Sequence, residues 1–216
     1  MATTPPAMRI KNRWFGSAEG KSAAEQASAM AFIVFRVARQ MLERMRSAGF
    51  DIDPGPGYFA FLREVLCFLV ALADRLAFER LGADGRAEFT AALVRHLARN
   101  LAENEDGLLG PRPAGSPSHA ETFIDLVNEL SAHYAEFGAD PQPPADAIGF
   151  HPDFGFQRYL GVRLEPTLPD KDRRWVLDQV MVIEAPEAIT VVQRSMRELL
   201  DPRQSPARRR SALSGD

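Results

Sequence analysis

The sequence contains a single cysteine, Cys67, among its 216 residues. One thiol cannot form an intramolecular disulfide, and one chain cannot build a multi-thiolate zinc or iron–sulfur site from it. This shortage favours a reducing compartment, so we expect a cytoplasmic protein. The apolar neighbours of Cys67 also predict an inert thiol, because apolar surroundings disfavour the reactive thiolate.

Long hydrophobic runs are also missing from the sequence. The longest unbroken apolar stretch is Val65 to Ala73, whereas a membrane-spanning helix needs roughly 20 such residues. The N-terminal residues likewise lack the continuous apolar segment of a secretory signal. We therefore expect this stretch to form a core helix, and we expect no insertion into a membrane.

The sequence has no strong charge of either sign. Its formal net charge is −3 and its pI is about 5.9, so no large positive field favours nucleic acid as a partner. Basic residues do collect near the C-terminus, at Arg208, Arg209 and Arg210, where solvated charge in a disordered tail is the simplest interpretation. The positive charge is almost entirely arginine and alanine is abundant, which leads us to expect a bacterial source.

Alternating strand patterns are few, and apolar residues instead recur at three- and four-residue spacing, which is typical of helices. Ser22 with Glu25, and again Ser118 with Glu121, have the spacing of a capping box, in which each side chain satisfies the other residue's free backbone N–H. Proline and glycine clusters separate the helical patterns. We therefore predict helices over residues 22–48, 58–82, 84–103, 118–137, 154–162 and 170–200, the last one kinked near Pro186.

These elements predict an all-α, single-domain helical bundle of six to seven helices. The domain covers residues 21–200, with a flexible segment at 1–20 and a disordered basic tail at 201–216. Two proline-rich loops, "ENEDGLLGPRPAGSPS" and "GADPQPPADAIGFHPD", interrupt the bundle. The first of them is long enough to serve as a lid or as a plain connection.

Glu184 raises the main question about chemistry, because it follows four apolar residues in "VMVIE". On a continuous helix it lies between Leu177 and Val180, on the side where the core should be. A buried carboxylate there needs a proton, an arginine or histidine partner, or a metal. Pro186 offers a structural alternative, which we favour: the helix breaks, Pro186 starts a new helix, and Glu184 turns into a solvated elbow.

Metal-binding patterns are weak in this sequence. His-Glu-x-x-His and the Glu-x-x-His pairs of di-metal bundles are absent. Glu129, His133 and Glu136 could converge on one helix face as metal ligands, but that face points away from the apolar stripe, so a solvated face is the preferred interpretation. His96 borders an apolar stripe, where a hydrogen-bonded boundary histidine is the simpler explanation. We expect no metal and no other cofactor.

The segment "GFHPDFGFQRY" groups aromatic and polar residues. Phe154, Phe156 and Tyr159, with Arg158, could wall a ligand pocket or face a subunit interface. Closure of one end of the bundle by the aromatic rings is the alternative that we favour.

The sequence contains no P-loop and no serine nucleophile elbow, so we lean against an enzyme. We expect a non-enzymatic interaction or regulatory module that acts as a homodimer through part of the segment from Trp175 to Leu200, with a further protein partner left open. The alternative is a metal-dependent enzyme or a small-molecule-binding protein, with Glu184 and His96 lining a pocket between helices.

Overall fold

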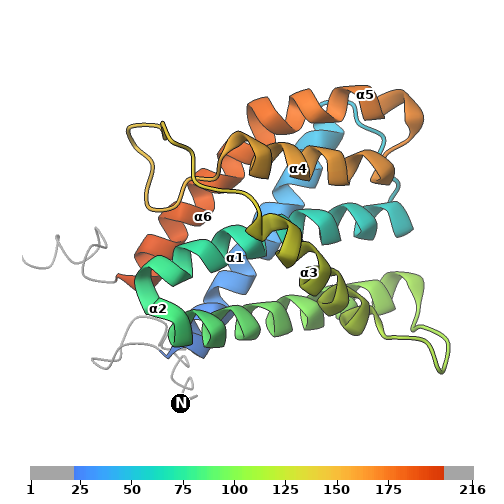
Figure 1. Cartoon of the computed structure of the whole chain (residues 1–216). Helices are drawn as coiled ribbons and strands as arrows, with labels where there is room; N and C mark the ends of the chain where they lie inside the picture. Colours follow the sequence, from blue (N-terminus) through green and yellow to red (C-terminus); the bar gives the residue numbers. More distant parts are fainter. Residues whose placement is uncertain (1–21, 202–216) are drawn as a thin grey trace, which may run out of the picture.

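The computed structural model describes residues 22–201, which are helical apart from their loops and contain no strand. Figure 1 shows the arrangement of the helices. The elements are α1 (Ala23–Ser47), α2 (Pro56–Leu109), α3 (His119–Ala135), α4 (Phe154–Leu164), the 3₁₀ turn η2 (Glu165–Thr167), α5 (Asp170–Gln179), the π-turn η3 (Val180–Glu184) and α6 (Ala185–Leu200). The all-α prediction is confirmed. The predicted segment at 1–20 and the predicted tail beyond Asp201 lie outside the described residues.

The described chain has five continuous helical stretches instead of the six to seven predicted, because the two helices predicted over 58–103 are joined. The kinked segment predicted over 170–200 is one stretch, in which α5, η3 and α6 follow one another without a break. Their junction is Gly82, whose φ of 66° and ψ of −169° are not helical. Figure 1 shows that α2 turns back there, so that its first arm, residues 56–81, and its second arm, residues 83–109, run side by side in opposite directions. Gly82 makes this reversal without a loop, because a residue without Cβ adopts a positive φ readily.

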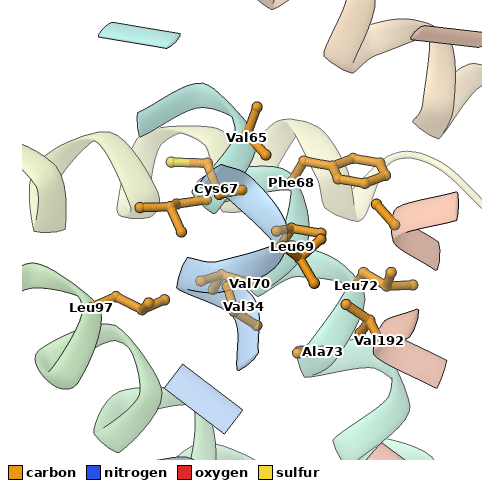
Figure 2. Packing of buried hydrophobic residues seen from close by; sticks show 14 of the residues in the cluster. Val34, Val65, Cys67, Phe68, Leu69, Val70, Leu72, Ala73, Leu97 and Val192 are labelled. Carbon is orange, nitrogen blue, oxygen red and sulfur yellow. The ribbon is translucent and has the colours of Figure 1, made fainter. Parts of the chain in front are cut away.

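The first arm of α2 is the centre of the core. It is buried on nearly all sides over residues 59–73. α2 as a whole packs most extensively against α1 and also contacts α3 and α6. Figure 2 shows Val34 of α1, Leu97 of the second arm and Val192 of α6 around Leu69, Val70 and Ala73. A helix that is apolar all round must be covered in this way.

The helix starts follow the sequence signals closely. Ser22 caps α1 and Ser118 caps α3, and each forms the complete capping box with Glu25 and Glu121, respectively. The two proline-rich segments are non-helical over 110–118 and 136–153. The first predicted loop is shorter than expected, because α2 continues as a helix to Leu109.

One described helix, α2, is long and apolar enough to cross a membrane by length and composition alone. Its most apolar window is 72% buried among the other helices. That burial is the environment of a core helix, as predicted for the stretch from Val65 to Ala73.

Candidate functional site

Glu184 is fully buried and paired, so the predicted solvated elbow is wrong. Arg44 of α1 approaches its Oε2 atom with Nε at 2.9 Å and with Nη2 at 2.7 Å. Gln179 donates from Nε2 to the Oε1 atom of Glu184 at 3.1 Å. Both carboxylate oxygens therefore have a partner, which is what an ionised group needs in a core.

The π-turn explains how the helix passes Pro186. Pro186 has no N–H to bond the carbonyl of Val182, and the N–H of Ala185 bonds the carbonyl of Val180, five residues back. The chain therefore remains helical at the predicted break, although Figure 1 shows that α5 and α6 run in different directions. Glu184 stays on the core side, as expected for a continuous helix.

The same turn exposes apolar side chains. Val182 is 74% exposed, Ile183 is 40% exposed, and Trp175, two turns earlier, is 54% exposed. Pro186, four residues after Val182, is exposed as well. We call these four residues the apolar ridge. The usual distribution of side chains is thus inverted at η3, where a carboxylate is buried and aliphatic side chains are exposed. Because exposed apolar patches often mark contact surfaces, the apolar ridge is the candidate functional surface.

Close packing on the inner side holds the ridge in position. Arg44 bridges Glu184 and Glu187, with its Nε 3.2 Å from Oε2 of Glu187. Gly161 of α4 is buried against Leu177, so closely that a Cβ at position 161 would lie 2.6 Å from the Cδ1 atom of Leu177. These contacts tie the ridge to α1 and α4.

His96 and Glu184 are not brought together. The partners of Glu184 are Arg44 and Gln179, and His96 is half-buried on the second arm of α2 without a hydrogen bond to another described residue. Figure 1 shows the second arm and α5 on opposite sides of the view. The predicted pocket between Glu184 and His96 therefore does not form in the described chain.

Glu129, His133 and Glu136 lie on the exposed side of α3 and at its C-terminal end. Within residues 22–201 no three histidine, cysteine or carboxylate side chains form a group that could hold a metal. The ring of His133 instead packs 5.9 Å from that of Tyr159, measured between centroids. The solvated face is thus the arrangement that these three residues adopt.

The aromatic segment closes one end of the core. Phe156 is fully buried and packs against Phe68, Tyr134, Phe137 and Phe150, with ring centroids between 4.7 and 6.4 Å apart. Tyr159 is half-buried, whereas Phe154 and Arg158 are exposed. Tight packing of this kind favours bundle closure over a ligand pocket at Phe156 and Tyr159.

Four charged residues on the first arm of α2 form polar contacts that no pattern in the sequence predicted. Arg163 of α4 donates two hydrogen bonds to Glu64, and Arg63 pairs with Glu105 on the second arm. Farther along the first arm, Asp74 pairs with Arg86, and Arg75 donates to the carbonyls of residues 134, 135 and 137 at the end of α3. The sequence did carry one indication of these contacts: four charged residues interrupt an otherwise apolar helix. Charged side chains in such a helix need partners when they are buried.

This environment shifts several pKa values. The hydrogen bond to Glu64 raises the pKa of the Arg163 guanidinium. Burial, followed by the nearby Glu64 carboxylate, raises the pKa of the Cys67 thiol, which agrees with the predicted inert cysteine. Burial likewise raises the pKa of Tyr134, whose hydroxyl has no hydrogen-bond partner among the described residues.

Open grooves flank α3 on both sides. One, of about 420 Å³, lies against the first arm of α2 and is lined by Arg63, Glu64, Asp125 and Glu129 among others. Another, of about 500 Å³, lies against the second arm, and its lining includes Ala87, Ala91, Arg86 and Arg95. Neither groove contains a fixed catalytic pair, so the apolar ridge remains the stronger candidate.

The chain was compared with protein-family models, curated proteins and solved structures, and no family model, curated protein or solved structure matches it.

Proposed function

We propose that this protein is a non-enzymatic interaction or regulatory module that acts as a cytoplasmic homodimer, with the apolar ridge as the contact surface between the two copies. The observation that carries the proposal is the inverted polarity at η3, where Val182 is 74% exposed and Glu184 is fully buried. Apolar side chains grouped on one exposed surface are typical of protein contact sites.

A second copy is the partner that we propose for the ridge. A two-fold axis brings the same surface of both copies together. If the axis crosses the middle of the ridge, the exposed Val182 and Ile183 of the two copies meet at the centre and cover one another. The charges beside the ridge already have partners within the chain, since Lys171 pairs with Asp51 and Glu187 pairs with Arg44.

The ridge also has the rigidity of a contact surface. Because Arg44 holds Glu184 and Glu187 from α1, the helical turn that presents Val182 and Ile183 is fixed before any partner arrives. Surfaces that are ordered in advance lose less conformational entropy on association. This supports binding through the ridge.

The alternative function, a metal-dependent enzyme or a small-molecule-binding protein, needed Glu184 and His96 to line one pocket. Arg44 and Gln179 occupy both oxygens of Glu184, and His96 is not among its partners. No contact in the described chain supports this alternative.

Native mass spectrometry of the full chain tests the proposal. We expect a dimer for the natural sequence and a shift toward monomer for Val182→Glu, because an unpaired carboxylate at the centre of a closed interface is costly. Leu108→Glu is the matched control: Leu108 is also an exposed aliphatic residue, at 60%, but it lies near the end of α2, away from the ridge.

The expected effect is a dimer dissociation constant at least about 10-fold higher for Val182→Glu than for Leu108→Glu, which corresponds to roughly 1.4 kcal/mol. A natural chain that stays monomeric at micromolar concentration contradicts the homodimer. A dimer that both variants weaken equally contradicts the ridge as its interface.

A further inference from the structure

His119, the first residue of α3, lies where the second arm of α2 ends and the 110–118 loop returns to the fold. Its side chain is only 8% exposed. The Nδ1 atom lies 3.3 Å from Nε of Arg112 and 3.4 Å from Oε1 of Glu105. The Nε2 atom lies 3.5 Å from the carbonyl oxygen of Gly110 and 3.6 Å from Oδ1 of Asp106.

The Nδ1 atom of His119 thus faces a donor and an acceptor together. The Nε–H of arginine can only donate, and a carboxylate oxygen can only accept. A neutral ring satisfies this geometry when Nδ1 accepts from Arg112 and the Nε2–H group donates toward Gly110. A protonated ring carries N–H on both nitrogens, so it can no longer accept from Arg112.

We propose that His119 is a pH-operated latch for the 110–118 loop. The neutral ring holds Arg112, and through it the loop, against the junction of α2 and α3. The protonated ring donates from Nδ1 to Glu105, breaks its hydrogen bond to Arg112 and repels the guanidinium. This latch does not involve the apolar ridge, so it stands or falls independently of the proposed dimer.

The charges around the ring come from three parts of the chain. Glu105, 1% exposed, and Asp106, about half exposed, belong to α2, as does Arg63, which pairs with Glu105. Arg112 belongs to the loop, and the carboxylate of Glu121 on α3 is held by the Ser118 cap. The N-terminus of α3 disfavours a positive ring, whereas Glu105 and Asp106 favour it.

Glu105 can accept a hydrogen bond from the protonated ring. Its Oε1 atom, which also pairs with Arg63, already faces Nδ1, and its Oε2 atom is buried without a hydrogen-bond partner among the described residues. Imidazole rings change charge between about pH 5 and 8.

Release of the loop changes the surface next to α3. Pro117 lines the groove of about 420 Å³ beside Arg63 and Glu129, and it also lines a second groove, of about 310 Å³, beside Glu121. Loss of the Arg112 contact frees the loop that carries Pro117. The position of Pro117, and with it the shape of both grooves, therefore depends on pH under this proposal.

Amide hydrogen exchange of the full chain, at pH 7.5 and pH 5.5, tests the latch in the loop peptide that contains Ser116. After correction for the intrinsic effect of pH, we expect exchange to be about 2- to 10-fold faster at pH 5.5, the change that follows from the loss of one hydrogen bond. The ring nitrogens of His119, followed by NMR in the same samples, report its protonation.

Two variants distinguish the effect of His119 protonation from a general increase of amide exchange in acid. His119→Gln keeps an acceptor for Arg112 and a donor for Gly110 but cannot titrate, so its loop exchange should be equal at the two pH values. Arg112→Ala, at an exposed position, should exchange fast at both. The proposal is overturned if the natural chain shows no pH effect, if His119→Gln shows the same rise, or if the ring stays neutral at pH 5.5.

Discussion

The guanidinium of Arg163 on α4 donates two parallel hydrogen bonds to the carboxylate of Glu64 on α2, from Nε to Oε2 at 2.9 Å and from Nη2 to Oε1 at 2.7 Å. The Glu64 side chain is 11% exposed. Arg163→Met leaves this carboxylate without a cation, and we expect a loss of about 3 kcal/mol in the free energy of unfolding. Urea denaturation measures this loss.

Arg39→Met is the control for that experiment. Arg39 pairs with Glu43 at 3.6 Å on the surface of α1, where both side chains are more than half exposed. We expect a loss below about 0.5 kcal/mol, since water screens such pairs. Equal losses for Arg39→Met and Arg163→Met would show that burial does not set the strength of the Glu64 pair.

Removal of Arg44 should destabilise the fold strongly. In Arg44→Met the fully buried Glu184 loses its cation, and we expect a loss of about 3 to 5 kcal/mol in the free energy of unfolding. Urea denaturation at neutral pH measures this loss.

The double variant Arg44→Met with Glu184→Gln checks that the loss comes from the unpaired Glu184 carboxylate. Glutamine carries no charge at this buried position, so part of the lost stability should return. A double variant that is no more stable than Arg44→Met would show that another contact of Arg44 is responsible.

Gly82 and Gly107 should respond in opposite directions to alanine. Both have open space where a Cβ would lie, but Gly82 has a φ of +66°, in the region that favours glycine. Gly82→Ala should cost about 1 to 3 kcal/mol through backbone strain at the reversal of α2. Gly107→Ala should add about 0.5 to 1 kcal/mol of stability, because alanine is the better helix former. Thermal unfolding of the two variants compares them, and a stabilised Gly82→Ala would contradict a strained reversal.

Tyr134→Phe should leave the protein as stable as before, or more stable, at neutral pH. The Tyr134 hydroxyl is buried and has no hydrogen-bond partner among the described residues, so its removal relieves a desolvation cost of about 1 to 3 kcal/mol against little lost bonding. Burial raises the pKa of Tyr134, so its contribution to stability is complete below the unfolded pKa of about 10 and is lost as pH rises above that value. The variant should therefore lose less stability between pH 9 and 11. Urea denaturation at these pH values measures both effects, and a marked loss at neutral pH would reveal a partner for the hydroxyl.

Local signals in the sequence predicted the helix boundaries best. Ser22 with Glu25 and Ser118 with Glu121 form the capping boxes expected from a three-residue spacing, because both partners lie within one helical turn. The stretch from Val65 to Ala73 lies in the core, as its lack of polar residues required. Such predictions succeed when the deciding interactions are close in the chain.

Contacts between residues that are distant in the chain left no such local signal. Pro186 favoured a break and a solvated Glu184, but Arg44, 140 residues away, stabilises the carboxylate inside the fold. The partners of Glu64 and Asp74 were also hidden, since they lie on other helices or across the Gly82 reversal.

The sequence by itself therefore determined the all-α class, the capped helix starts and the central apolar helix, because hydrophobic periodicity and capping act within a few residues. Only the tertiary structure decided that α2 folds back on itself at Gly82, that Glu184 is buried against Arg44 and that Val182 and Ile183 face solvent. The physical reason is that the cost of burying a charge or exposing an aliphatic side chain depends on its neighbours in space, which the order of residues along the chain does not reveal.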